Sequence, residues 1–395
     1  MEVRSSNNIE ASPMELYIHI PFCIRKCDYC DFLSFRALSS VHEAYVQQLI
    51  REIRAQSCYC TDCQVVSVFI GGGTPSLLEP SCISRIMETV FSCFQVEPEA
   101  EITIEANPGT LLGKKLPVYR QCGINRVSIG LQSADNTELK NLGRIHSFEE
   151  FLKSFQSARM AGFTNINIDL MSGIPGQTLE SWKNTLKKVT MLKPEHISAY
   201  SLIIEEGTPF WNRFGEGACA CDYTGPALPD EDTENKIYRF TRKFLQEQGF
   251  ERYEISNYAK PGKECRHNIG YWTEVAYLGL GLGASSLLEH MRFSNTADMK
   301  EYIGNSAFPD KIRQNMESLT EADEMAEFMF LGLRMTEGVS MEAFAEYFGK
   351  NMESIYGEVL KKHFALGMLK KKNDRIFLTR RGIHVSNGVM ADFLL

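Results

Sequence analysis

The segment PFCIRKCDYC, residues 21–30, carries three cysteines in the spacing C-x3-C-x2-C, directly after the first β-type run of the chain. Thiolates of Cys23, Cys27 and Cys30 can hold three irons of a four-iron, four-sulfur (4Fe–4S) cluster and leave the fourth iron open. An open coordination position lets a cofactor or substrate bind the metal directly. The alternative is a zinc site with its fourth ligand elsewhere, because the cysteine spacing alone fits both metals.

A glycine-rich loop, GGGTP at residues 71–75, follows the second β-type run. Glycines let backbone amides approach a ligand closely, which suits a loop that cradles a bound cofactor. A triple glycine is weak evidence by itself. Placed after a strand–helix unit that carries the cysteine motif, it favours the iron–sulfur interpretation over zinc.

Short β-type runs alternate with helical ones between Glu15 and about Tyr200. Repeated strand–helix units predict a parallel sheet, either open or curled into a barrel. The predicted strands are Leu16–Ile20, Val65–Ile70, Glu101–Glu105, Arg126–Gln132, Asn165–Leu170 and His196–Ser201. The predicted helices include Glu43–Arg54, Cys82–Phe94, Phe148–Met160 and Leu179–Met191.

Polar side chains occupy one face of several predicted strands. Thr103 and Glu105 alternate with isoleucines, and the next three predicted strands repeat the pattern. A doubly wound sheet would be apolar on both faces, and a closed eight-stranded barrel fills its lumen with branched side chains. We therefore expect an α/β fold built on a wider, incomplete barrel whose polar faces line a ligand cavity. Amphipathic strands of an antiparallel sheet are the alternative, which the intervening helices disfavour.

The alternation of strand and helix patterns ends after Glu206. A polar stretch follows, then a predicted helix, Thr233–Gln248, and then a tract rich in glycine and tyrosine. The end of the chain combines helices with a β-type pair, which is typical of a small winged-helix-like domain. The predicted organisation is a tail at 1–14, a barrel at 15–215, an extension at 216–308 and a mainly helical C-terminal domain at 309–395.

Composition and charge argue against three classes of protein: general nucleic-acid binders, membrane-spanning proteins and secreted proteins. The formal net charge of -8 argues against a general nucleic-acid binder, which needs a basic surface. No apolar run is long enough to cross a bilayer, and residues 1–13 lack the build of a secretion signal. We therefore expect a cytoplasmic protein, in which twelve cysteines stay reduced rather than form a disulfide framework.

Beyond the cysteine motif, the chain resembles the coproporphyrinogen III oxidase-like (HemN/HemW) family of radical S-adenosylmethionine (SAM) proteins over almost its whole length. The resemblance implies a partial (β/α)6 barrel, TIM-like in layout, with a 4Fe–4S cluster whose open iron binds SAM. It also implies an electron donor for the cluster. The matching stretches are Tyr17–Cys23, Gly71–Ser76, Glu105–Gly109, Arg126–Ser133, Asp169–Thr178 and His196–Phe210.

The resemblance also assigns residues to the two cofactors. It implies cluster ligation by the three motif cysteines. Carboxylates suit ribose hydroxyls and an ammonium group, and an arginine fork suits a carboxylate, so the implied SAM contacts are chemically reasonable. They are Tyr17, Tyr29, Gly72, Gly73, Thr74, Glu105, Gln132, Arg144 and Asp169.

Two features separate the branches of this family. The dehydrogenase pattern requires a fourth cysteine where this chain has Phe32, and a longer extension before Tyr17. The segment CRHNIGYW, residues 265–272, matches an H-N-x-x-Y-W motif that the resemblance links to haem. A histidine can ligate haem iron, so we expect His267, placed in a loop, to bind haem, with Cys265 as an alternative ligand.

The sequence therefore predicts a haem chaperone that passes haem to acceptor haemoproteins. The enzymatic alternative is oxygen-independent oxidation of coproporphyrinogen III. A zinc-stabilised binding module without redox chemistry is the third possibility.

The remaining cysteines are predicted to have ordinary roles. Those of the cluster 58–63 are expected to be solvent-facing loop thiols, although a zinc or accessory cluster there is the alternative. Others lie in the polar stretch after the barrel or are expected to pack in the core. In chain order they are Cys58, Cys60, Cys63, Cys82, Cys93, Cys122, Cys219 and Cys221.

Overall fold

The computed structural model describes residues 11–111, 113, 115–218 and 224–394. Among these residues the main element is one sheet of twelve strands. Strands β1 to β6 lie side by side in chain order, and every neighbouring pair is parallel. Their bounds are Ser12–Ile20, Cys63–Gly72, Gln95–Ala106, Arg126–Gln132, Ile166–Ser172 and His196–Ser201. The predicted incomplete parallel barrel is confirmed.

The register of the sheet explains the polar faces seen in the sequence. Glu105 pairs with Ser128, Ser128 with Asn167, and Asn167 with His196. Side chains at paired positions of neighbouring strands share a face, so these residues form one polar band across the lumen. The alternate positions, such as Ile129, are fully buried under the outer helices.

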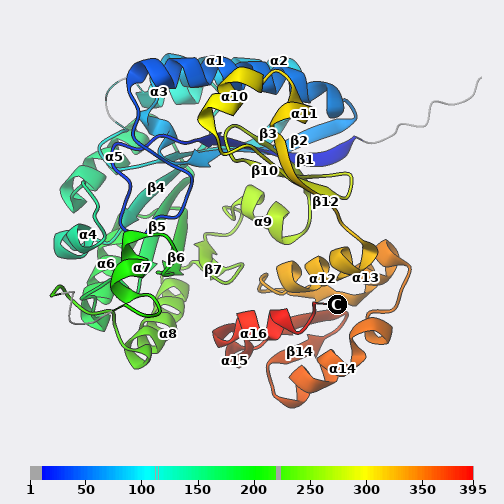
Figure 1. The fold of residues 1–395 in the computed structure, drawn as a ribbon. Helices are drawn as coiled ribbons and strands as arrows, with labels where there is room; N and C mark the ends of the chain where they lie inside the picture. Colours follow the sequence, from blue (N-terminus) through cyan, green and yellow to red (C-terminus); the bar gives the residue numbers. More distant parts are fainter. Residues whose placement is uncertain (1–10, 112, 114, 219–223, 395) are drawn as a thin grey trace, which may run out of the picture.

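Helices that connect the strands cover the outer face of the sheet, with α1 and α2 above it in Figure 1. Capping boxes at Ser147 and Thr178 start α5 and α6, which match their predicted bounds. The bounds of α1 to α6 are Ser39–Gln56, Pro80–Cys93, Lys115–Gln121, Asn136–Asn141, Phe148–Met160 and Leu179–Met191.

Strand β3 begins six positions before its predicted start. Gln95 and Val96 already pair with β2, and the pairing resumes at Glu101 after a shift in register. The intervening residues include Pro98, which cannot donate a ladder hydrogen bond. Because a proline inside a run argues against a strand, the sequence pattern did not predict this early start.

The extension adds strands to both edges of the six-stranded unit. Beyond β6 lie β8 and β7, whereas β9 pairs with β1 in parallel and is followed by β10, β11 and β12. Strand β12 lies past the expected boundary at residue 309, so the large sheet continues to Ser318. The bounds of β7 to β12 are Glu251–Arg252, Asn257–Ala259, Ala276–Leu280, Ser285–Leu288, Met291–Asn295 and Arg313–Ser318.

In the described part of the chain, helices α7 to α11 lie between β6 and β12 in sequence order. Helix α9 lies beneath the sheet, between it and the C-terminal helices (Figure 1). The bounds of α7 to α11 are Pro209–Phe214, Glu231–Glu247, Arg266–Trp272, Met299–Asn305 and Pro309–Ile312.

The C-terminal residues form a separate lobe with its own hydrophobic core, which includes Met329, Phe344 and Tyr356 (Figure 1). Helices α12 to α16 surround a small sheet in the order β13-β15-β14. Their bounds are Glu321–Gly332, Met341–Phe348, Met352–Ala365, Arg380–His384 and Ser386–Ala391, with strands Val339–Ser340, Leu369–Lys372 and Arg375–Leu378. None of the helices that the structure describes has the length and apolar character needed to span a membrane.

Candidate cluster and cofactor site

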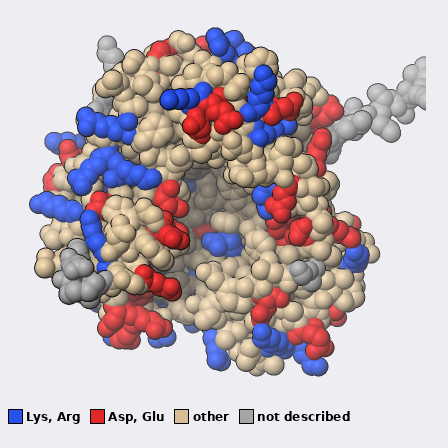
Figure 2. Space-filling model, in the orientation of Figure 1, with Lys and Arg blue, Asp and Glu red and all other residues tan. Residues whose placement is uncertain are grey.

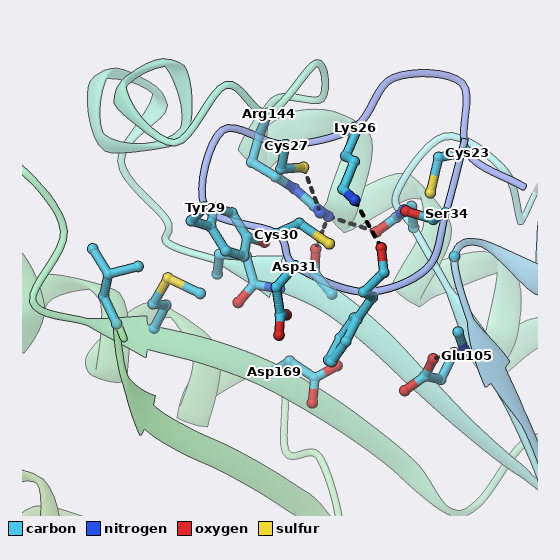
Figure 3. Close-up of a pocket in the computed structure, with 18 of the residues that line it drawn as sticks. Cys23, Lys26, Cys27, Tyr29, Cys30, Asp31, Ser34, Glu105, Arg144 and Asp169 are labelled. Carbon is cyan, nitrogen blue, oxygen red and sulfur yellow. Dashed lines mark hydrogen bonds between the residues drawn. The ribbon is translucent and has the colours of Figure 1, made fainter. Parts of the chain in front are cut away.

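A cavity of about 350 Å³ opens at the carboxyl ends of the parallel strands. The loop after β1 supplies Cys23, Cys27 and Cys30 to its wall (Figure 3). Within the described part of the chain, no three His, Cys, Asp or Glu side chains gather closely enough to hold a single metal ion. Ligands of a four-iron cluster stand further apart, because each thiolate binds a different iron. Three thiols on one cavity wall therefore fit the predicted cluster.

The glycine loop holds the start of the cysteine loop in place. The amides of Gly73 and Thr74 donate to the carbonyls of Ile20 and Phe22, each at 2.8 Å. A Cβ on Gly73 would lie 2.7 Å from the Phe22 carbonyl oxygen, closer than real Cβ contacts allow. A glycine is required here because the two backbones touch, which explains why the glycine loop accompanies the cysteine motif.

Arg144 joins the cysteine loop to the strand ends. Its Nη2 donates to the Gly130 carbonyl and to Asn107 Oδ1, both at 2.6 Å, and its Nη1 lies 3.5 Å from Cys27 Sγ (Figure 3). Burial raises the pKa of the neighbouring Cys30 thiol. The fixed guanidinium therefore holds a positive charge beside the cysteine loop, in the wall of the cavity.

Two carboxyl groups face the cysteines from the opposite wall of the cavity (Figure 3). Burial, with the nearby charge of Asp169, raises the pKa of Glu105 to about 8, although the Gly72 amide donates to it at 3.0 Å. Burial also raises the pKa of Asp169, against hydrogen bonds from Asn167 and Ser128. Burial disfavours the ionised form of both groups. A cationic or hydroxyl-rich ligand that binds between them would favour that form.

Gln132 has a backbone conformation that marks the same cavity. Its φ of 72° lies in the left-handed region, which is uncommon for a residue other than glycine. The register with β5 shifts between Gly130 and Gln132, and the Gln132 amide oxygen accepts a hydrogen bond from Tyr200 at 2.8 Å. Strain held at a ligand cavity is typical of a functional site.

The cavity brings together most of the residues that sequence analysis assigned to SAM. Tyr17 does not line it and instead lines a second cavity, with its hydroxyl 3.0 Å from His19 Nδ1. Thr74 stands behind the cysteine loop, 3.5 Å from Cys23 Sγ. The assigned residues that do line the cavity are Tyr29, Gly72, Gly73, Glu105, Gln132, Arg144 and Asp169.

Asn107 and Tyr200 are among the residues of this cavity that were not assigned from the sequence. Asn107 donates to Thr74 and accepts from Arg144, so it links the glycine loop to the guanidinium. It follows Glu105 at the two-residue spacing of a strand face, a signal that could have identified it. Tyr200 lies in the last of the predicted strands, His196–Ser201, but only the structure shows its contact with Gln132.

A second cavity of about 540 Å³ lies beside the first and shares Phe32, Gly72 and Glu105 with it. Figure 2 shows that this face of the molecule is deeply hollowed at its centre, with acidic side chains on the rims. Aromatic side chains form much of the wall of the second cavity, among them Tyr17, Phe69, Tyr271 and Tyr277.

His267 lines the second cavity, but its predicted loop placement is wrong. The residue lies in helix α9 and only 1% of it is exposed, because α9 packs against β2 and covers it. Burial lowers its pKa to about 3, so the ring is neutral. Cys265 is fully buried, and its thiol donates to Glu101 at 3.3 Å rather than facing this cavity.

The prediction of solvent-facing loop thiols at 58–63 is right for Cys58 and wrong for Cys60, which is buried against the core, while Cys63 is partly buried at the start of β2. Cys82, Cys93 and Cys122 pack against the core as predicted. Cys219 and Cys221 lie outside the described residues.

Comparison with known proteins identifies the family. The family model of the radical SAM superfamily matches residues 17–189, and that of the HemN C-terminal domain matches residues 319–385. A protein named heme chaperone HemW from Lactococcus lactis is 36% identical, covering 97% of this chain and 98% of the relative. The Escherichia coli protein of the same name is 34% identical, covering 98% and 99%.

A solved structure has the same fold. It is that of coproporphyrinogen III oxidase (HemN) from Escherichia coli, described as a radical SAM enzyme. The TM-score is 0.83 at 25% identity, and the match covers 97% of this chain and 90% of the other. With the cysteine loop, the glycine loop and the partial barrel in place, this chain belongs to the HemN/HemW family of radical SAM proteins.

Proposed function

We propose that this protein is a haem chaperone of the radical SAM family, which binds haem and delivers it to acceptor haemoproteins. The observation that carries the proposal is the second cavity, with aromatic walls and His267, directly beside the cluster cavity. Aromatic faces suit a flat porphyrin, and a histidine suits its iron. The names of the curated relatives support the same activity.

The cluster cavity has a defined part in this proposal. Cys23, Cys27 and Cys30 would hold the 4Fe–4S cluster, which supplies a single electron for SAM chemistry when it is loaded. Arg144 is placed to bind a carboxylate beside Cys27. Glu105 and Asp169 are placed to bind hydroxyl or ammonium groups of SAM.

Phe32 separates this proposal from the oxidase alternative. It occupies the position of the fourth cysteine in the dehydrogenase pattern, and it stands where the two cavities meet, with 63% of its surface exposed. A fourth thiol is therefore missing from the cavity wall. We also propose that the protein works in the cytoplasm with a separate electron donor for the cluster.

Haem titration of the anaerobically reconstituted protein tests the chaperone function. We expect the wild type to take up haem with a shifted Soret band, and His267→Ala to lose most of this uptake. His290→Ala is the matched control, because His290 is exposed and lies outside both cavities. A wild type that takes up no haem, with or without the cluster, would overturn the proposal.

The enzymatic alternative is tested on the same sample. Incubation with coproporphyrinogen III, SAM and a reductant should give no vinyl product. Formation of protoporphyrinogen IX would show the oxidase activity instead.

A further inference from the structure

A chain of hydrogen bonds runs from the second cavity to a buried carboxyl group. The hydroxyl of Tyr271 lies 3.2 Å from His267 Nε2. On the other side of the ring, Nδ1 lies 2.7 Å from Ser67 Oγ, which donates to Glu15 Oε1 at 3.0 Å. Glu15 and Ser67 are direct register partners on β1 and β2, so the sheet itself sets their spacing.

The position of the proton on the imidazole depends on the direction in which the hydrogen bonds of this chain are donated. A serine hydroxyl has one hydrogen, and Ser67 gives it to Glu15. With Ser67 donating to Glu15, its oxygen is left to accept from His267 Nδ1, which also lies 3.5 Å from Glu15 Oε2, and this arrangement puts the ring proton on Nδ1. In a neutral imidazole the other nitrogen has the lone pair, and Nε2 accepts from the Tyr271 hydroxyl.

We propose that Glu15 and Ser67 are positioning residues that hold His267 with Nε2 ready to bind haem iron, and that the Tyr271 hydroxyl caps this nitrogen until haem displaces it. The inference rests on the proposed haem-binding function. Histidines that ligate metals commonly donate their other ring N–H to an oxygen acceptor, which fixes the tautomer and ring orientation. Ser67, backed by Glu15, provides that acceptor here.

The surroundings of the ring prevent it from turning. Phe69 stacks on His267 with centroids 5.0 Å apart and planes 20° apart. Gly270, one helical turn along α9, has no room for a side chain, because a Cβ there would lie 2.2 Å from Glu15 Oε1. The helix that carries His267 is therefore seated directly on the carboxyl group that anchors the chain.

The cap is the part that can move. Tyr271 is partly exposed, lines the cavity of about 540 Å³ and packs edge-on against Tyr277. Displacing its hydroxyl breaks one hydrogen bond and leaves the oxygen facing the cavity, where water can pair with it. No proton has to leave His267 for Nε2 to bind iron.

The tautomer is tested without haem. Nitrogen chemical shifts of selectively labelled histidine in the full-length protein should show His267 with a protonated Nδ1 and an unprotonated Nε2. The His267→Ala spectrum assigns the signals. The opposite tautomer would overturn the inference whatever the protein does with haem.

Haem titration of variants tests the positioning role. Ser67→Ala should weaken haem binding about tenfold or more, the usual effect of losing such a partner. Glu15→Leu should do the same, whereas Glu15→Gln keeps an acceptor oxygen for Ser67 and should recover most of the affinity. Wild-type affinity in both Ser67→Ala and Glu15→Leu would overturn the inference.

A separate variant tests the capping role of the Tyr271 hydroxyl. Tyr271→Phe keeps the ring but removes the hydroxyl, so haem should bind faster and at least as tightly as in the wild type. Tyr347→Phe, which removes an exposed hydroxyl, is the control. Slower or weaker binding by Tyr271→Phe would overturn the capping role. A wild type that binds no haem would refute the proposed function, while the tautomer measurement would still stand.

Discussion

Burial and ligand binding have opposite effects on the protonation of Glu105: burial favours the neutral carboxyl group, and a cationic ligand favours the ionised one. Its side chain lines both cavities, and burial raises the pKa of its carboxyl group to about 8. Without a ligand the group is therefore mostly protonated at neutral pH. A cationic, hydroxyl-bearing ligand such as SAM favours the ionised form, so binding below that pKa must release the proton.

We expect SAM affinity to rise with pH up to about pH 8 and then to level off, by at most about tenfold per pH unit for this one proton. Glu105→Gln should bind SAM more weakly and lose this part of the slope. Equilibrium binding to the reconstituted protein measures both. Glu88→Gln, on the exposed side of α2, should keep the wild-type slope, and an unchanged slope in Glu105→Gln would contradict the assignment.

Residues on strands could be predicted from the sequence because a strand alternates its faces. Glu105 and Asp169 were identified in this way, and both line the cavity. Arg144 follows α4 in a loop, where no periodicity applies, and only the family resemblance identified it. The burial of His267 could not be predicted either, because it depends on contacts between α9 and β2, which are about 200 positions apart in the chain.

Among the helices and strands, α9 has the placement on which the second cavity depends most, because it carries His267 and Tyr271. It is a short helix of seven residues, so its own hydrogen bonds stabilise it little and its position depends on packing. Gly270 allows the helix to rest against Glu15 on β1. The sequence predicted long elements such as α5, α6, β4 and β6 at their observed bounds, but did not predict this helix, because seven residues show too little periodicity.

Gly270→Ala should destabilise the fold by about 1–3 kcal/mol, because the added methyl group overlaps the Glu15 carboxyl group. The free energy of unfolding in urea measures the loss. Gly357→Ala is the matched control: Gly357 lies in α14, and a Cβ added there would have nothing within 4 Å, so alanine should stabilise that helix by up to about 1 kcal/mol. Equal stability of Gly270→Ala and the wild type would show that α9 can shift freely.

At the scale of the whole molecule, the large sheet joins segments that the sequence divides into separate regions. Strand β9 pairs with β1, so residues from the extension complete the edge of the barrel. Glu52 of α1 strengthens this junction, because it accepts hydrogen bonds from Tyr302, the Gly281 amide and Asn295. The sequence predicted the fold class, but pairing between distant strands depends on register and could not be read from local patterns.

Glu52 gives this junction a pH dependence. Burial outweighs the donated hydrogen bonds and raises its pKa from 4.5 to about 7. Between these values the folded protein keeps a proton that the unfolded chain has released, so the free energy of unfolding should fall as pH rises, by at most about 1.4 kcal/mol per pH unit. Urea titrations across this window should show a shallower slope in Glu52→Gln, whereas exposed Glu88→Gln should follow the wild type.

Phe32, Gly72 and Glu105 belong to the walls of both cavities. If filling one cavity moves any of these side chains, the two ligands become thermodynamically linked. The factor by which SAM changes the affinity for haem must then equal the factor by which haem changes the affinity for SAM. Through the shared wall, the affinity for one ligand would then depend on whether the other ligand is already bound.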